Sequence, residues 1–173
     1  MKIEDGGVTG IGDYSFNDCV GFQSLNLNSG LLYIGKNAFE DCSGFTGSLV
    51  IPDTVSFIDD FSFSDCRNFE KLDLGCGVTG IGFGAISGAT GLKSFGAGNQ
   101  LIATAAQFTG QDWNNLVVKG CNEIPYAQDD YFYYKPYAKQ STLTLEEGIK
   151  YIPQDAFNAS PSTNIVFARW RFT

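Results

Sequence analysis

The strongest constraint on the fold is a nine-residue segment that recurs along the chain at nearly constant spacing. It reads IGDYSFNDC from Ile11, IGKNAFEDC from Ile34 and IDDFSFSDC from Ile58, so the isoleucines are 23 and then 24 residues apart. A weaker copy, IGFGAISGA, begins at Ile81, and IPQDAFNAS begins at Ile152 after a gap of 71 residues, about three further periods. Such a period is typical of stacked repeats, and it predicts two degraded turns between the last two copies.

Each repeat has a second half in which two apolar residues flank one other residue. Alternation with period two predicts a strand whose apolar side chains point inward. The predicted inward pairs are Leu25/Leu27, Leu49/Ile51, Leu72/Leu74, Leu116/Val118, Leu143/Leu145 and Ile165/Phe167. Met1 and Ile3 are predicted to be the inward pair of a strand that precedes the first full repeat.

The first half of each repeat is predicted to be a short helical turn. Ser15, Phe16 and Cys19 have the spacing of one helix face, and the next two copies repeat this spacing. Because one repeat cannot bury its apolar side alone, neighbouring copies must stack and their strands must form a parallel sheet. The predicted fold is an α/β repeat. It is a solenoid of about six to seven turns with a parallel β-sheet on one face and short helical or irregular segments on the other.

The repeated pattern resembles the BspA-type leucine-rich repeat. The pattern GxTxIGxxAFxxC followed by xLxxLxI matches the first three repeats, and GSLVIPDTV at Gly47 to Val55 is also typical of that family. The fourth repeat departs from the pattern, with Ile86 and Ala89 in place of Phe and Cys. The chain is therefore predicted to be a single leucine-rich-repeat solenoid over residues 1–173. Clear repeats occupy 1–96, degenerate turns occupy 97–140, and the last clear repeat occupies 141–173.

The charge balance argues against two classes of partner. The 173 residues include 19 acidic and 11 basic side chains, a formal net charge of -8. Such a chain repels phosphate backbones and anionic lipid head groups, so neither nucleic acid nor a membrane surface is expected as a partner. No apolar run approaches the roughly 18 residues that a membrane-spanning helix needs. The start, MKIEDGG, lacks the apolar core of a signal peptide, so none is expected in this chain.

Catalysis is not expected, and neither is a cofactor or a metal. The chain contains no histidine, which removes the common catalytic triads and the most frequent metal ligand. Three adjacent acidic pairs occur: Asp59-Asp60, Asp129-Asp130 and Glu146-Glu147. They lack the spacing of a calcium-binding loop and are predicted to be solvated surface charge.

The five cysteines leave the redox compartment open. Cys19, Cys42 and Cys66 occupy the same place in three repeats, and stacking brings their α-carbons to about 4.8 Å, within disulfide range. Parallel stacking nevertheless favours buried free thiols, because such side chains point the same way and pack as small hydrophobes. Cys76 and Cys121 follow strands two turns apart, about 9–10 Å, which is too far for a disulfide unless the fourth repeat bulges. Both are therefore expected to be unpaired.

Two regions are candidates for partner binding. One is the outward face of the predicted sheet, at Ser24, Asn26, Ser48, Val50, Lys71, Asp73, Ser94, Asn115, Val117, Thr142 and Thr144. Its small, mostly neutral side chains suit a glycan or a protein loop, but an ordinary solvated sheet face has the same composition. The other is the aromatic segment with Tyr131, Phe132, Tyr133 and Tyr137, with Trp113 as a companion. Tyrosines suit sugar or protein recognition, although these could also patch a degraded repeat.

The resemblance implies a non-catalytic interaction or adhesion module, displayed on a bacterial cell surface or secreted, that binds a protein or glycan partner. The alternative is a structural component of a larger assembly, such as an envelope layer or a phage virion. The predicted strand edges at Met1–Glu4 and Ile165–Phe172 carry no obvious polar cap. They favour the alternative, because exposed strand edges invite end-to-end self-association.

Overall fold

A computed structural model describes residues 1–2, 7–98, 115–119, 142–147 and 163–167 of the chain. The chain divides into two compact units, Met1–Leu92 and Lys93–Thr173. Both units contain parallel strands. No helix in the described ranges is long and apolar enough to cross a membrane.

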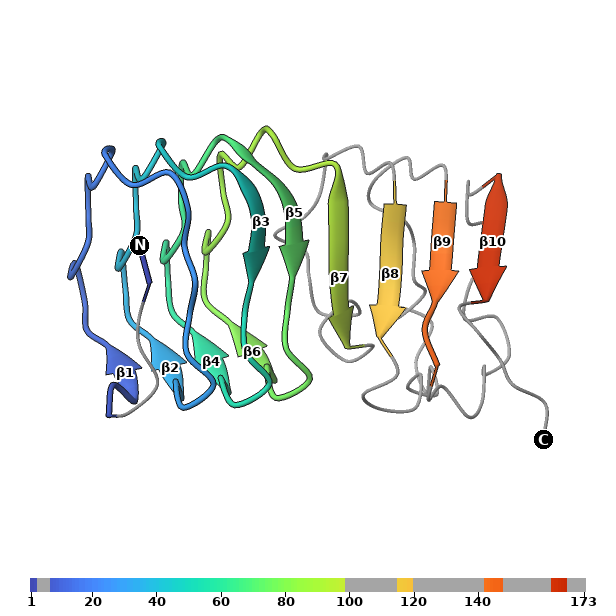
Figure 1. Ribbon diagram of the computed structural model, residues 1–173, viewed down its shortest axis with the longest axis horizontal. Coiled ribbons are helices and arrows are strands. Elements are labelled where there is room, and N and C mark those ends of the chain that lie inside the picture. Colours follow the sequence, from blue (N-terminus) through green and yellow to red (C-terminus); the bar gives the residue numbers. More distant parts are fainter. Residues whose placement is uncertain (3–6, 99–114, 120–141, 148–162, 168–173) are drawn as a thin grey trace. The chain divides into compact units, whose positions relative to one another are not determined.

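The first unit consists of four successive turns, each of which starts at one of the repeated isoleucines (Figure 1). A short strand in each turn contributes to a four-stranded parallel sheet, here called the short-strand sheet. In sheet order its strands are β1 (Gly10–Ile11), β2 (Tyr33–Ile34), β4 (Phe57–Ile58) and β6 (Gly80–Ile81). The isoleucines are in register, because Ile34 pairs with both Ile11 and Ile58, and Ile58 also pairs with Ile81. The predicted repeat is therefore confirmed at the level of strand register.

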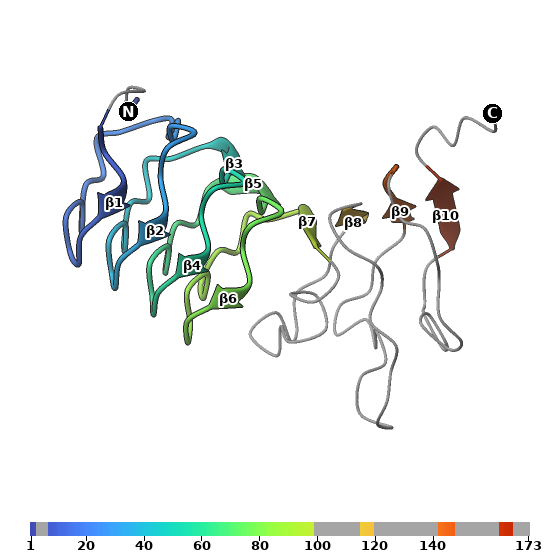
Figure 2. The same ribbon diagram turned by 90° about the horizontal axis from the view of Figure 1, so that it is seen from below.

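The predicted apolar-x-apolar strands form a second parallel pair in the same unit, β3 (Gly47–Val50) and β5 (Phe69–Asp73). Leu49 lies opposite Leu72, and both are buried, whereas Val50 is exposed. This is the alternation that the period-two pattern predicts. In Figure 2 the short-strand sheet and the β3–β5 pair lie on different sides of the first unit.

The first repeat shows the same alternation without a full strand. Leu25 and Leu27 are buried and Asn26 is exposed. The backbone N–H of Asn26 donates to the carbonyl oxygen of Met1 at 3.0 Å, and Lys2 forms a parallel bridge with Asn26. The predicted strand before the first repeat is described only as this bridge. Met1 is half-buried, and Ile3 lies outside the described residues, so their role as an inward pair stays a prediction.

The segment that follows each repeated isoleucine, here called the return segment, is not helical, which corrects the sequence-based prediction. Residues three and seven positions after each isoleucine have a positive φ: Tyr14, Asp18, Asn37, Asp41, Phe61, Asp65, Gly84 and Gly88. An α-helix requires right-handed dihedral angles throughout, so left-handed residues at these two places stop it from forming. The described residues contain no helix, and the α/β class is therefore wrong for them.

Hydrogen bonds between successive turns take the place of the helix. In the first turn, the N–H groups of Tyr14, Phe16 and Asp18 donate to carbonyl oxygens of the second turn at 2.9, 2.8 and 2.9 Å. The second and third turns repeat the pattern in the same register. In the first three turns, the short strand and the return segment both form hydrogen bonds to the next turn. These bonds fix the path of the backbone from one turn to the next.

Two ladders of phenylalanine rings fill the core. Phe39 stacks between Phe16 and Phe63, with ring centroids 5.2 Å away on each side. Phe45 likewise lies between Phe22 and Phe69, at 6.3 and 5.5 Å. The inner rings are fully buried, whereas Phe22, in the first turn, is partly exposed. Each fully buried ring contributes roughly 1.5–3 kcal/mol, so these ladders are a principal source of stability.

The second unit contains four parallel strands: β7 (Ser94–Gly98), β8 (Asn115–Lys119), β9 (Thr142–Leu145) and β10 (Asn164–Phe167). Leu116 pairs with Leu143, which pairs with Ile165, so the predicted apolar residues share one register. The inward direction is not confirmed throughout. Leu145 is buried, but all four side chains of β10 are exposed.

The described residues support a repeat solenoid with parallel strands but not every predicted detail. The first unit has four turns, and the predicted total of six to seven is not supported. The predicted single solenoid over residues 1–173 stays a prediction, and most of its degenerate part, 97–140, lies outside the described residues.

Candidate functional site

The predicted sheet face exists on the first unit as a short row of outward side chains. Ser48 lies opposite Lys71 and Val50 opposite Asp73 on the paired strands β3 and β5. Ser48 and Val50 are exposed, whereas Lys71 and Asp73 are half-buried. The Lys71 ammonium forms an ion pair with Asp73 at 3.2 Å (Nζ to Oδ2), so these two charges partly offset each other. Ser24, in the first repeat, is exposed as well.

The predicted sheet-face residues of the second unit are also in register. Ser94 pairs with Asn115, which pairs with Thr142, and Val117 pairs with Thr144. Val117, Thr142 and Thr144 are half-buried. The structure therefore places Ser48, Val50, Lys71 and Asp73 on shared rungs of the first unit, and the five sheet-face residues of the second unit on shared rungs there. Their role in binding stays a prediction.

The aromatic segment cannot be placed on either face of the strands. Tyr131, Phe132, Tyr133, Tyr137 and Trp113 all lie outside the described residues. Their proposed recognition role stays a prediction.

Sequence reasoning missed a second exposed face, on the outer side of the short-strand sheet. Its central rung holds Gly10, Tyr33, Phe57 and Gly80, which pair in this order. Tyr33 is 50% exposed and Phe57 is 42% exposed. A period-two pattern around each buried isoleucine places the preceding residue outward, but a two-residue strand is too short to reveal it.

The two rings on this face lie over glycines of neighbouring strands. A Cβ atom added to Gly10 would lie 2.1 Å from Cε1 of Tyr33, and one added to Gly80 would lie 2.7 Å from Cδ2 of Phe57. The two rings thus point in opposite directions, and each packs over the glycine of an outer strand, Gly10 of β1 or Gly80 of β6. Glycine is required at both places, because any side chain there would displace the ring.

Carboxylates cover a second row of glycines on the same face. Asp13 Oδ1 accepts the N–H of Lys36 at 2.9 Å, and a Cβ on Gly35 would lie 2.6 Å from that oxygen. Asp60 Oδ1 accepts the N–H of Phe83 at 2.6 Å and lies in the same way over Gly82. Aspartate suits these places because its short side chain can bond a backbone N–H in a turn.

Of the three adjacent acidic pairs, Asp59-Asp60 departs from the prediction of solvated charge. Both residues are half-buried, and Asp59 Oδ1 accepts the N–H of Asp60 at 2.7 Å. Glu146 and Glu147 lie just after β9, half-buried and exposed respectively, and Asp129-Asp130 lies outside the described residues. Among the described residues no group of three or more potential ligands could hold a metal ion.

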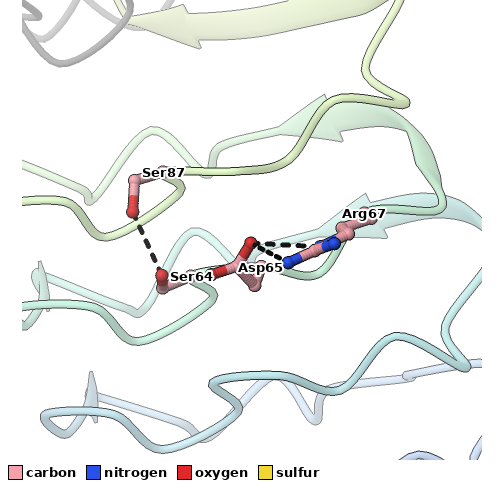
Figure 3. Close-up of polar contacts among 4 residues, drawn as sticks. All are labelled: Ser64, Asp65, Arg67 and Ser87. Atoms are coloured by element: carbon pink, nitrogen blue, oxygen red, sulfur yellow. Dashed lines mark hydrogen bonds and ion pairs between the residues drawn. The ribbon is translucent and has the colours of Figure 1, made fainter.

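The return segments carry the left-handed residues Asp18, Asp41 and Asp65 at equivalent positions, here called the acidic ridge. Figure 3 shows Asp65 and its neighbours. Asp65 is paired with Arg67, whose Nη2 atom lies 2.9 Å from its Oδ1. Beside it, the hydroxyl groups of Ser64 and Ser87 are hydrogen-bonded across two successive turns at 3.0 Å. Asp65 is therefore partly neutralised, and it belongs to the inter-turn scaffold.

The repeats match a family model, BspA type Leucine rich repeat region (6 copies), over residues 1–110. The chain belongs to the BspA-type leucine-rich repeat family. The match covers more than half of the chain, and the predicted resemblance is confirmed. Solenoid families of this kind generally act by binding rather than by catalysis.

Two solved structures are similar to this BspA-type chain. A leucine-rich repeat protein from Bacteroides ovatus ATCC 8483 is 24% identical over 59% of this chain and 25% of that one, with a TM-score of 0.52. A leucine rich cell surface protein from Faecalibacterium prausnitzii A2-165 is 17% identical over 98% of this chain and 60% of that one, with a TM-score of 0.29. The first match supports the fold. The chain spans about a quarter and three fifths of these proteins, respectively. No curated protein matches it significantly.

The cysteines of the BspA-type repeats are free thiols inside the stack. Cys42 and Cys66 are buried and Cys19 is half-buried, and none of the three forms a disulfide. Burial raises the pKa of Cys42 to about 11 and raises that of Cys66 further. A thiol that stays protonated is a poor nucleophile, so these cysteines are packing residues.

The prediction for Cys76 is wrong, because this residue is disulfide-bonded. It is exposed in the segment after β5, and its N–H donates to Asp53 Oδ1 at 2.8 Å. The prediction treated Cys76 as fixed at a strand position. A residue in a turn is not bound to the strand spacing, so the distance argument does not apply to it. Cys121 lies outside the described residues.

A cavity in the first unit is too small to hold a substrate. It has a volume of about 10 Å³ and is lined only by apolar and thiol side chains, Phe63, Cys66 and Ala89 among them. It lies where Ile86 and Ala89 replace the phenylalanine and cysteine of the earlier turns. The cavity is a packing defect of the fourth repeat.

Proposed function

We propose that the chain is a non-catalytic interaction module at a bacterial cell surface that binds a protein or glycan through its β3–β5 sheet face and the equivalent row of the second unit. The observation that carries the proposal is the register of outward side chains, with Ser48 opposite Lys71 and Val50 opposite Asp73. The backbones of β3 and β5 are hydrogen-bonded to each other, so this surface is ordered before a partner arrives. Binding therefore costs little conformational entropy.

The surface location is supported by family membership and by the cysteine chemistry. Cys76 forms a disulfide, a bond typical of proteins that mature in an oxidising environment. The buried thiols of Cys42 and Cys66 do not oppose this, since they are protected from oxidants inside the core.

The proposal is tested by screening the purified chain against immobilised glycans and extracellular host proteins. The double substitution Ser48→Arg/Val50→Arg places two long cations on the sheet face and is expected to abolish a specific interaction. The matched control is Val20→Arg/Gln23→Arg, which adds the same charge at exposed positions of the first repeat, outside β3 and β5. A ligand lost equally in both variants, or retained in both, rules out the sheet face as its site.

A second function is favoured by one observation, the exposure of every side chain on β10. Under this alternative the chain is a structural component, in an envelope layer or a virion, joined through its ends, because an exposed apolar strand invites pairing. Light scattering across a concentration series tests it with Ile165→Lys and with a deletion of Met1–Glu4. Discrete oligomers that either change abolishes support assembly, whereas a monomer at all concentrations rules it out.

A further inference from the structure

The net charge of the chain is confined to its first unit. Residues 1–92 contain 12 acidic and 4 basic side chains, a formal charge of -8, whereas residues 93–173 contain 7 of each and sum to zero. The first unit therefore attracts cationic partners over distances of about a Debye length, roughly 8–10 Å, and repels anionic ones.

Within the first unit, the outer face of the short-strand sheet combines two features that bind cations. Tyr33 and Phe57 present rings about half exposed, each lying over a glycine. Asp13 and Asp60 lie over glycines two residues further along the strands, about 7 Å away at 3.3–3.4 Å per residue. Asp59 directly follows Ile58, at the position that Gly35 and Gly82 occupy in the neighbouring turns. We call these five residues the aromatic–carboxylate face.

Each of the three carboxylates, those of Asp13, Asp59 and Asp60, has an oxygen atom that can accept a hydrogen bond from a partner. Each uses Oδ1 to accept one backbone N–H, from Lys36, Asp60 or Phe83. Oδ2 of Asp13, Asp59 and Asp60 has no partner among the described residues, so each can accept a further hydrogen bond. Lys36 is the only basic residue between Lys2 and Arg67 in the sequence, and the three carboxylates outnumber it.

We propose that the aromatic–carboxylate face binds a basic segment of a partner protein. An arginine or lysine side chain lies on the Tyr33 or Phe57 ring, and its cationic end bonds the carboxylate two residues along. Cation–π contact contributes about 0.5–1 kcal/mol at exposed sites, and arginine adds bidentate hydrogen bonds to a carboxylate. Charge favours this occupant, because three carboxylates attract a cation, gain no Coulomb energy with a neutral glycan and repel an anionic one.

The inference shares with the proposed function only the premise that the chain is a binding module, because it concerns a different surface. The probe is a fluorescein-labelled peptide of alternating arginine and glycine, titrated with the full chain by fluorescence anisotropy at low and at physiological salt. A glutamate–glycine peptide and a neutral oligosaccharide are titrated in parallel. We expect saturable binding of the arginine peptide that weakens with salt, and no binding of the other two.

Matched variants separate the local site from the net charge. Asp13→Asn/Asp60→Asn keeps both Oδ1 acceptors and is expected to weaken binding roughly fivefold or more. Asp18→Asn/Asp41→Asn removes the same charge from the acidic ridge, at left-handed positions that asparagine tolerates. This control is expected to bind like the parent chain. Equal weakening by the two pairs would overturn the proposal in favour of non-specific attraction.

The rings are tested by Tyr33→Leu/Phe57→Leu, which retains apolar cover over the glycines. We expect weaker binding of the arginine peptide, while Phe22→Leu, at a partly exposed ring outside this face, leaves it unchanged. Urea unfolding confirms that each variant is folded. Ser48→Arg/Val50→Arg tests the β3–β5 face. It should change peptide binding no more than Val20→Arg/Gln23→Arg does, because both variants add the same charge. Preferential binding of the oligosaccharide, or of no probe, overturns the inference without touching the β3–β5 proposal.

Discussion

The thiol of Cys66 donates a hydrogen bond to the carbonyl oxygen of Phe39, one turn earlier, with 3.1 Å between Sγ and O. Cys42 makes the same bond to Phe16 at 3.0 Å. The repeated cysteine therefore has two roles in the stack. It fills apolar space, and it gives a carbonyl oxygen of the return segment a second hydrogen bond, since the oxygen of Phe39 also accepts the N–H of Cys42 at 3.3 Å.

These thiols make the fold sensitive to alkali. Burial raises the pKa of Cys42 from 9.0 to about 11, so between these values the unfolded chain has lost a proton that the folded chain keeps. Stability is then full below pH 9 and falls as pH rises toward 11, by up to about 1.4 kcal/mol per pH unit for each such thiol. Urea unfolding of the parent chain and of Cys42→Ala from pH 8 to 11 measures this. The variant should be less stable at pH 8 but show a shallower decline, and parallel curves would contradict the assignment.

The phenylalanine ladder predicts a graded response to truncation. Phe39 is fully buried between two rings, so Phe39→Ala should cost about 3–5 kcal/mol. Phe22 stacks on one ring only and is partly exposed, so Phe22→Ala should cost less than half as much. Chemical denaturation gives both values. Equal costs would show that the stack is not the source of the difference.

Repetition explains which parts of the fold could be predicted. Ile34, Phe39 and Leu49 recur at fixed spacing, which places each in the same environment as its counterparts, and all three are buried as expected. The same argument predicted the sheet-face rungs, because side chains alternate along a strand. Family resemblance added the fold name, and the family match confirmed it.

The return segments show where the pattern was ambiguous. The spacing of Phe16 and Cys19 fits a helical turn, but it also fits a path with left-handed residues at two intervening places. The distinguishing signal was the residue type at those places, where Asn37 and Gly84 belong to the types that tolerate a positive φ. The outer face was missed because β2 and β4 are only two residues long, too short to show an alternation.

A left-handed tyrosine predicts a stabilising substitution. Tyr14 has a φ of 57° and is 58% exposed, so its ring packs little while its backbone is strained. Asn37 occupies the same place in the second turn with a φ of 53°. Tyr14→Asn should therefore raise the free energy of unfolding by roughly 0.5–1 kcal/mol. Tyr14→Ala is the control, since it removes the ring but keeps the strain. An equal gain from alanine would assign the effect to the ring.

The fourth repeat predicts that its packing defect can be repaired. Ala89 lines the cavity of about 10 Å³ and stands where Cys66 stands one turn earlier. In Ala89→Cys, the new thiol should fill this space and donate to the carbonyl oxygen of Phe63, as Cys66 donates to Phe39. The expected gain is up to about 1 kcal/mol, from one buried group and one hydrogen bond.

The control for the cavity is the same substitution at Ala85, which is fully buried but does not line the cavity. Ala85→Cys should give no gain, because a closely packed site has no space for the sulfur atom. Unfolding by urea under reducing conditions compares the two variants without interference from new disulfides. A gain at both positions would mean that burying a thiol, rather than filling the cavity, stabilises the stack. A loss at both would mean that the fourth turn is already packed as tightly as the first three.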